Sequence, residues 1–577
     1  MTQSSTTSRA KRLDDAAHAA WAKTWMSMSP ESQLLAWMDW ISHLAISPGA
    51  RIDMAREALT LVHDCAKAHL FTVEGQEQCP GEMPDYDRRF KDPAWDRYPY
   101  NVLRRTFLLQ QKWWEYAVDR VDGVSAHHKR LVSFATKQWL DMFSPGNFLA
   151  TNPEVMDKTM QEGGANLARG FQHFMEDVRA RIDGTPPPGT EQFKVGQDVA
   201  TTPGKVVFRN RLIELIQYEP TTEKVYPEPV LIVPAWIMKY YILDLQPERS
   251  LIKYLVDQGH TVFAISWKNP GADESELGMA DYLQMGWGEA LDAVNAIVPG
   301  KKVHATGYCL GGTLLSVAAA AMVRDGDDRL KTISLLAAQT DFSEAGELGL
   351  FIDESQLNLL EAQMNQAGYL RADQMAGAFQ MLRSYDLLWS RLVNEYLLGD
   401  RVPLNALMAW NADATRMPAK MHAQYLRDFY LNNDLSAGRY EVGDRRVNLG
   451  NLRLPAFVVG TASDHVAPWQ SVYKVHSLMS GEITFVLTSG GHNGGIVSPV
   501  GHPRRRYQIA TQKPEDKRLW PEEWHEKAPI HEGSWWPAWE QWLVEYSGKK
   551  QLAPSMGAPE KGYVQIEDAP GQYVLEK

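Results

Sequence analysis

Hydrophobic positions follow two different rhythms along the chain. In the first third, apolar residues recur at helical intervals, for example in 19–26 and 102–109, and this spacing predicts helices. Consecutive prolines in 183–190 force extended backbone and end the pattern. We therefore expect a disordered, polar N-terminus over 1–15 and a mainly helical N-terminal domain over 16–190.

Short runs of consecutive apolar residues replace the helical spacing in the rest of the chain. Such runs predict buried strands, and helical stretches at 250–258 and 280–298 separate several of them. Strands that alternate with helices indicate a largely parallel sheet covered on both faces, so we expect an α/β catalytic domain over 191–577. The predicted strands are 206–208, 212–216, 230–233, 261–265, 303–306, 333–336, 456–459 and 483–486.

One long segment, 343–449, interrupts this alternation with helix-prone, aromatic sequence. Its aromatic residues include Phe351, Trp389, Trp410 and Tyr425. An insertion of this kind between late strands predicts a cap, or lid, over the active site. An ordinary peripheral layer of helices is the alternative interpretation.

Composition narrows the class of protein. Of the 577 residues, 44% are hydrophobic and 23% are charged, which is ordinary for a soluble globular protein. The net charge of −12 argues against nucleic acid as a partner, because a phosphate backbone attracts a basic surface. Three cysteines are too few for a disulfide framework, and no apolar run is long enough for a secretory signal or a membrane span. We therefore expect a cytoplasmic protein without a transmembrane segment.

The stretch 303–313 combines a predicted strand, a tight turn at Cys309 and the start of a helix. Gly307, Cys309 and Gly311 match the G-x-S-x-G nucleophile elbow of α/β-hydrolases, with sulfur in place of the serine oxygen. Glycine suits both outer positions because the strained turn crowds them. A thiol here also lies at a helix N-terminus, where free N–H groups and the dipole favour a thiolate. The alternative is a buried cysteine on an ordinary glycine-rich turn.

An acid and a base follow the cysteine in the order that this fold requires, each just beyond a predicted strand. Asp464 lies after one strand, and His492 lies in a glycine-rich loop after the next. We therefore predict a catalytic triad of Cys309, Asp464 and His492. His465 is the alternative candidate for the base. Because it adjoins the acid, we expect its ring to point away from Cys309 and to support the catalytic residues indirectly. We expect His304 to be packed inside the sheet.

These residue types predict an acyl-transfer mechanism. His492 takes the thiol proton of Cys309, and the thiolate attacks an acyl carbonyl while Asp464 orients the imidazole. The backbone N–H of Leu310 and one from the loop after the strand 230–233, for which Ile237 is the candidate, stabilise the oxyanion. Thiolate attack on a thioester exchanges one thioester for another, so cysteine favours acyl transfer over hydrolysis.

Distinct short motifs occur in one order along nearly the whole chain. They are KDPAW at 91–95, NFLATNP at 147–153, KYYILDL at 239–245, SWKNP at 266–270, GYCLGG at 307–312, WNADAT at 410–415 and GSWWPAW at 533–539. With these motifs the chain resembles the class I polyhydroxyalkanoate synthases. It departs from the usual sequence of that family at Met238, Lys268 and Asn493-Gly494, where asparagine, arginine and apolar residues are common.

The resemblance implies polymerisation of (R)-3-hydroxyacyl-CoA, of short chain such as 3-hydroxybutyryl-CoA, with release of CoA and covalent acyl-thioester intermediates. It also implies an α/β-hydrolase fold with a helical cap, a homodimer, and a location on the surface of cytoplasmic storage granules, where the growing polyester is a partner. No cofactor or metal ion is expected, because the CoA thioester is itself the substrate. The family's nucleophile, acid and base correspond to Cys309, Asp464 and His492. Whether Asp464 or His492 activates the substrate hydroxyl stays open.

Two other functions are compatible with these residues. A cysteine-dependent α/β-hydrolase, acting as a thioesterase or as a depolymerase of the same polyester, would use the same triad. A granule-coating protein would bind polyester through its aromatic residues and would keep only a vestigial elbow. The intact set of three catalytic residue types argues against this last interpretation.

Overall fold

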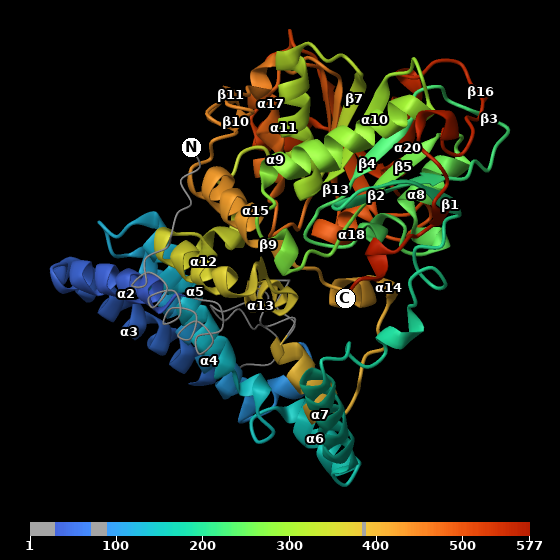
Figure 1. Cartoon of the computed structure of the whole chain (residues 1–577). Coiled ribbons are helices and arrows are strands. Elements are labelled where there is room, and N and C mark those ends of the chain that lie inside the picture. Colours follow the sequence, from blue (N-terminus) through green and yellow to red (C-terminus); the bar gives the residue numbers. More distant parts are fainter. Residues whose placement is uncertain (1–28, 71–88, 383–387) are drawn as a thin grey trace. The chain divides into compact units, whose positions relative to one another are not determined.

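The chain forms two compact units in the computed structural model, which describes residues 29–70, 89–382 and 388–577 (Figure 1). The larger unit comprises Gly189–Met375 and Leu404–Lys577, and the smaller comprises the described residues up to Pro188 together with Ala376–Pro403. The predicted disorder of 1–15 and the predicted helix at 19–26 lie outside the described residues.

Eleven strands of the described residues form one mixed sheet, which is the core of the larger unit. Its centre is parallel, and almost every side chain of the central strands is buried, so sequence and structure agree on this part. In spatial order these strands are β5 (Val262–Trp267), β4 (Val230–Val233), β6 (Val303–Tyr308), β7 (Leu330–Leu336), β12 (Ala456–Thr461) and β13 (Ile483–Thr488).

Antiparallel strands extend the sheet on both sides. The predicted strands 206–208 and 212–216 are part of β1 and β2, which lie beyond β5. Three further strands lack a continuous apolar run, because their side chains are largely exposed or half-buried, and sequence analysis missed them. The bounds of the outer strands are β1 Gly204–Arg209, β2 Ile213–Tyr218, β14 Arg506–Gln512, β15 Ile530–Glu532 and β17 Glu567–Asp568.

Helices connect the parallel strands and cover the sheet. Helix α11 packs against β6 and β7, α8 against β5, and α16 against β12. The predicted helix 280–298 is divided into α9, a π-helical stretch (Tyr282–Gly288) and α10. The helices are α8 Leu251–Asp257, α9 Met279–Asp281, α10 Glu289–Ile297, α11 Leu310–Asp325, α12 Glu354–Ala367, α13 Ala372–Leu382, α14 Ala406–Ala412, α15 Ala419–Gln424, α16 Trp469–Tyr473, α17 Val475–Leu478, α18 His492–Ile496, α19 Pro521–Lys527 and α20 Trp536–Glu545.

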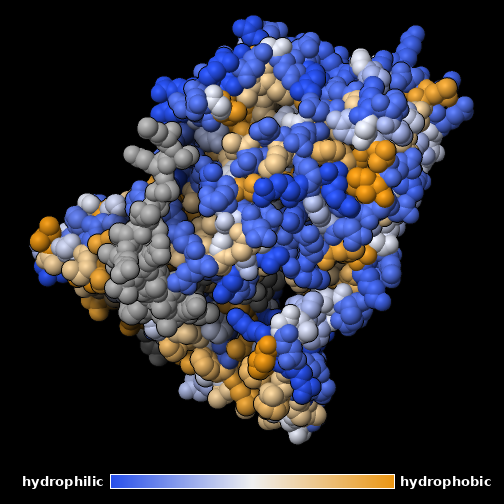
Figure 2. Space-filling view, in the orientation of Figure 1, coloured by the Kyte–Doolittle hydropathy of each residue, from blue (hydrophilic) through white to orange (hydrophobic). Residues whose placement is uncertain are grey.

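The smaller unit is helical, as the apolar spacing predicts. Ser125 and Asn152 cap two of its helices by accepting hydrogen bonds from N–H groups of the first turn. Its bounds are α2 Pro30–Ala45, α3 Pro48–Leu70, α4 Tyr100–Asp119, α5 Ala126–Met142, α6 Pro153–Gln161 and α7 Ala165–Asp183. Figure 2 shows hydrophobic side chains gathered over helices of this unit. None of the helices in the described ranges is both long and apolar enough to cross a membrane.

The predicted insertion 343–449 is shared between the two units. Its described residues 388–403 pack against α7, where Asn166 Nδ2 donates to the carbonyl of Leu397 (2.8 Å) and Tyr396 donates to Asp177 (2.7 Å). Residues 343–375 and 404–449 of the insertion belong to the larger unit and include α12, α14 and α15. That the insertion acts as a cap stays a prediction.

Candidate active site

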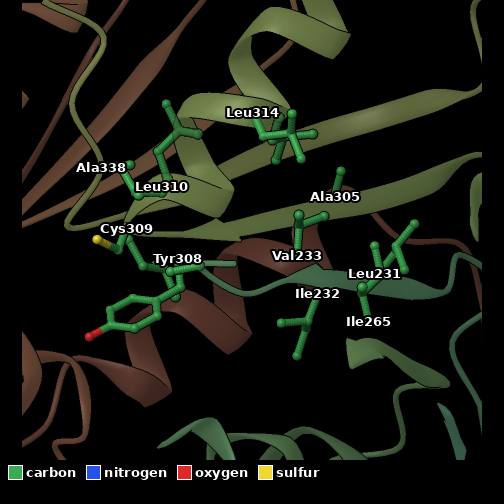
Figure 3. Close-up of a cluster of buried hydrophobic side chains, with 14 of the residues drawn as sticks. Leu231, Ile232, Val233, Ile265, Ala305, Tyr308, Cys309, Leu310, Leu314 and Ala338 are labelled. Atoms are coloured by element: carbon green, nitrogen blue, oxygen red, sulfur yellow. The ribbon is translucent and has the colours of Figure 1, made fainter. Parts of the chain in front are cut away.

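Cys309 lies on the tight turn between β6 and α11. Its backbone has φ 52° and ψ −124°, a strained conformation that a residue with a Cβ adopts only when its surroundings impose it. Those surroundings include the Cys309 N–H, which donates to the carbonyl of Leu336 on β7 (2.9 Å), and the Cys309 carbonyl, which accepts from Gly312 (2.9 Å). Figure 3 shows the sulfur at the end of the strand, pointing away from the buried apolar side chains around it. The cysteine is 9% exposed.

The two glycines of the elbow are sterically required. A Cβ on Gly311 would lie 2.0 Å from the carbonyl oxygen of Val233, and one on Gly307 would lie 2.3 Å from the Cα of Gly312. Both obstacles are backbone atoms, which cannot rotate away. The close approach also places the N-terminus of α11 directly beside the end of β4.

Asp464 is held by four hydrogen bonds just beyond β12. The hydroxyl of Thr461 donates to Oδ2 (2.7 Å), and the N–H groups of Val466 and Ala467 donate to Oδ1 (2.9 and 2.8 Å). The fourth bond joins Oδ2 to Nδ1 of His492 (2.8 Å). Burial raises the pKa of the carboxyl, but the charge of His492 and these hydrogen bonds outweigh it, so the pKa of Asp464 lies below its usual value.

His492 begins the short helix α18, four residues after β13, and lies between the acid and the cysteine. Its Nδ1 is bound to Asp464, which leaves Nε2 as the ring nitrogen available to Cys309. Burial opposes a charged imidazole, yet the charges of Cys309 and Asp464 outweigh it and hold the pKa of His492 well above its usual value. The arrangement favours the protonated form of the His492 imidazole.

Two tryptophans hold the loop that carries the base. The indole N–H groups of Trp535 and Trp536 donate to the carbonyls of Gly495 and Ile496 at the end of α18 (both 3.0 Å). Both indoles are almost completely buried. These two buried tryptophans therefore fix the position of the helix that begins with His492.

Tyr308 and Asn493 also belong to the site, and sequence analysis did not assign them a role. The Tyr308 hydroxyl donates to Oδ1 of Asn493 (2.5 Å), and the Tyr308 ring centroid is 5.8 Å from that of His492. Each residue is next to a predicted catalytic residue in the sequence. That position was the only sign in the sequence that either residue belongs to the site.

Three aromatic side chains pack against one another just before the insertion and within it: Phe342, Tyr425 and Tyr430. Tyr425 donates to the hydroxyl of Tyr430 (3.0 Å), and the rings of Tyr430 and Phe342 are 4.7 Å apart. Burial raises the pKa of Tyr430, and the charges of Cys309 and Asp464 add to the effect. Phe342 and Tyr425 belong to the same hydrophobic core as Cys309, and Tyr430 packs against that core.

The two predicted oxyanion donors lie on adjoining segments. Leu310 is the first residue of α11, where backbone N–H groups have no partner within the helix. Ile237 lies in the loop after β4, whose start contacts Gly311. Met238 follows and forms a backbone bridge with Ala414 of the insertion.

Of the two other histidines named from the sequence, His465 is exposed and His304 is buried. The side chain of His465 is exposed, and its backbone carbonyl accepts a hydrogen bond from Glu347 (3.4 Å). His304 is buried in β6, between the hydroxyls of Thr332 (2.8 Å) and Ser547 (3.0 Å), and burial lowers its pKa to about 3. Within the described ranges, no cluster of His, Cys, Asp and Glu could hold a metal ion.

Family models match most of the chain. The model described as "Poly-beta-hydroxybutyrate polymerase (PhaC) N-terminus" matches residues 86–255, and one described as "Poly-beta-hydroxybutyrate polymerase N terminal" matches 8–49. The model "alpha/beta hydrolase fold" matches 228–499, a range that contains Cys309, Asp464 and His492. Together with the parallel sheet and the helical smaller unit, this match confirms the predicted fold class.

Three relatives share extensive sequence with this chain. A poly(3-hydroxyalkanoate) polymerase of Methylorubrum extorquens is 42% identical over 86% of this chain and 82% of its own. The poly(3-hydroxyalkanoate) polymerase subunit PhaC of Rhizobium meliloti is 39% identical over 86% of this chain and 80% of its own. The subunit of the same name from Cupriavidus necator is 35% identical over 98% of this chain and 96% of its own.

Proposed function

The chain belongs to the family of poly(3-hydroxyalkanoate) polymerases, which are acyltransferases, and we propose that it polymerises (R)-3-hydroxyacyl-CoA through a thiolate on Cys309. The observation that carries this proposal is the hydrogen bond between Asp464 and His492, together with the electrostatic interaction of His492 with Cys309 on a strained elbow. Nucleophile, base and orienting acid in this order are the requirements of covalent acyl transfer.

The first step loads an acyl group onto the enzyme. The Cys309 thiolate attacks the thioester carbonyl of the substrate, and the N–H groups of Leu310 and Ile237 stabilise the oxyanion that forms. When the carbon–sulfur bond to CoA breaks, the CoA thiolate takes the proton of the His492 imidazolium and leaves as free thiol. A thioester on Cys309 replaces the thioester of the substrate.

The second step extends the chain. The 3-hydroxyl of another acyl unit attacks the Cys309 thioester, its proton passes to His492, and an ester bond forms as the Cys309 thiolate leaves. We assign this deprotonation to His492 and not to Asp464. Both oxygens of Asp464 already accept two hydrogen bonds each, and its side chain is 0% exposed, which leaves no access for a substrate hydroxyl.

The proposal extends to the acyl group, the location and the assembly. The names of the two N-terminal family models support a short substrate, 3-hydroxybutyryl-CoA. A polyester of such units carries no charge along its length and separates from water, so the enzyme works at the surface of polyester granules. It acts as a homodimer, which molar-mass measurement by light scattering tests directly.

The decisive experiment is incubation with 3-hydroxybutyryl-CoA, following CoA release and turbidity together. A polymerase releases CoA and produces insoluble polyester in the same reaction. Release of CoA with soluble 3-hydroxybutyrate as the product would identify a cysteine hydrolase instead, and absence of CoA release would reject this substrate. Cys309→Ala is the control and is expected to abolish both signals.

A further inference from the structure

Lys239 is a buried cation close to the proposed oxyanion loop. Its side chain is 3% exposed, and its ammonium group contacts Asp413 Oδ1 (3.0 Å) and the backbone carbonyls of Val574 (2.5 Å) and Glu576 (2.8 Å). Burial lowers the pKa of Lys239, and Asp413 opposes this effect. Taking an ammonium group out of water is unfavourable, so its surroundings must compensate with this set of acceptors.

The acceptors come from two segments far from Lys239 in sequence. Asp413 belongs to the insertion, and its Oδ2 also accepts a hydrogen bond from Tyr241 (2.9 Å). Val574 and Glu576 belong to the C-terminal segment, 573–577, which is itself fixed where the Glu576 carboxylate accepts from the N–H of Asn269 (3.0 Å). One ammonium group thus joins three parts of the larger unit.

The insertion and the elbow hold the backbone of the loop at its two ends. The indole of Trp410 donates to the carbonyl of Lys239 (2.8 Å), and Met238 forms a backbone bridge with Ala414. At the other end, the carbonyls of Val233 and Pro234 press against Gly311 of the elbow. Ile237 lies between these two anchor points.

We infer that Lys239, through its contacts with Asp413 and the C-terminal segment, is a positioning residue that sets the backbone N–H of Ile237 for the oxyanion. The inference rests on the proposed acyl-transfer function and deepens it. Lys239 itself does not touch the reacting atoms. If its ammonium group is removed, the carbonyls of Val574 and Glu576 lose this donor and Asp413 keeps only Tyr241 and Lys577 as partners, so the loop relaxes. A small displacement of an oxyanion donor is enough to slow acyl transfer strongly.

Two reactions of Cys309 separate this role from general stability. Acylation by phenyl thioacetate passes through an oxyanion, whereas alkylation by iodoacetamide is a displacement at carbon that forms none. Lys239→Met is expected to lower the maximal rate of acylation about 10²-fold, the range seen when one oxyanion donor is lost. Its apparent affinity for the thioester and its alkylation rate stay within about threefold of those of the unmodified protein, because Cys309, His492 and the hydrophobic core around them are unchanged.

Matched variants complete the test. Lys302→Met removes an exposed lysine that pairs with Asp328 and is expected to change neither reaction. Asp413→Asn keeps the size of the side chain and one acceptor oxygen, and is expected to show an intermediate loss of acylation with normal alkylation. If Lys239→Met does not fold, the acylation and alkylation rates of Asp413→Asn test the inference instead.

Equal losses of acylation and alkylation in these variants would overturn the inference, as would normal acylation. These outcomes can be told apart from a failure of the proposed polymerase function. If the unmodified protein makes no polyester but Lys239→Met still loses acylation selectively, the role of Lys239 stands and the proposed substrate falls.

Discussion

The hydroxyl of Tyr308 donates a hydrogen bond to Asn493 Oδ1 at 2.5 Å, which joins the residue before the nucleophile to the residue after the base. Tyr308 ends β6 and Asn493 lies in α18, so the bond connects the strand that carries Cys309 to the helix that begins with His492. The geometry between cysteine and histidine is therefore supported from immediately adjacent positions.

This bond predicts unequal effects of removing its two partners. Asn493→Leu leaves the Tyr308 hydroxyl, in a side chain that is 2% exposed, without an acceptor, so the free energy of unfolding of the larger unit should fall by about 1–3 kcal/mol. Tyr308→Phe leaves only the half-buried Asn493 amide, which water can reach, and should cost about 0.5–1.5 kcal/mol. The double variant should resemble Tyr308→Phe. Urea unfolding followed by circular dichroism measures all three, and a larger effect of Tyr308→Phe would contradict the argument.

Gly311 gives a prediction about the elbow itself. In Gly311→Ala the new Cβ meets the carbonyl oxygen of Val233 at 2.0 Å, so β4 or α11 must shift. We expect a destabilisation of about 3 kcal/mol or more and loss of acyl transfer. Gly49→Ala, in helix α3 with no atom within 4 Å of the new Cβ, is the control and should be neutral or slightly stabilising. Thermal unfolding compares them, and an undisturbed Gly311→Ala would refute the steric argument.

The central strands and the order of the chemical groups could be predicted from sequence because both depend on local features. A strand buried on both faces needs an unbroken apolar run, as in Val230–Val233, and an elbow needs glycine at fixed positions. In a parallel sheet the strand ends meet at one edge, so Cys309, Asp464 and His492 could be expected to lie close together. Their catalytic roles stay a prediction.

Contacts between distant segments could not be predicted in this way. Nothing near Lys239 in sequence indicates that its ammonium group binds the carbonyls of Val574 and Glu576. The backbones of Gly170 and Tyr396 also approach closely. A Cβ added to Gly170 would lie 1.9 Å from the backbone carbonyl oxygen of Tyr396. Such contacts depend on how distant segments pack in three dimensions, so the local spacing of apolar residues does not predict them. The outer strands β14, β15 and β17 were missed for a related reason, since strands with exposed or half-buried side chains resemble loops in composition.

Replacing sulfur with oxygen tests the thiolate argument. Cys309→Ser keeps the Cβ and therefore the strained backbone of the turn, so any loss reflects chemistry. An alkoxide needs a stronger base than His492 provides, and the resulting oxygen ester transfers its acyl group poorly. We expect CoA release to fall at least about 10²-fold. Near-normal CoA release by the serine variant would show that the pairing of thiolate and imidazolium is not needed.

The raised pKa of His492 predicts how its contribution to stability depends on pH. Burial opposes the imidazolium, but the charges of Cys309 and Asp464 hold the folded-state pKa well above the ordinary value of 6.5. A group whose pKa is raised by folding stabilises the protein fully below its unfolded-state pKa and loses this effect as pH rises through its folded-state pKa. The difference in unfolding free energy between the unmodified protein and His492→Gln should therefore be largest near about pH 6 and should shrink at alkaline pH. Cys309→Ala removes the largest upward influence on that pKa, so in its background the difference should vanish at a lower pH; a difference that grows with pH would contradict the thiolate–imidazolium pair.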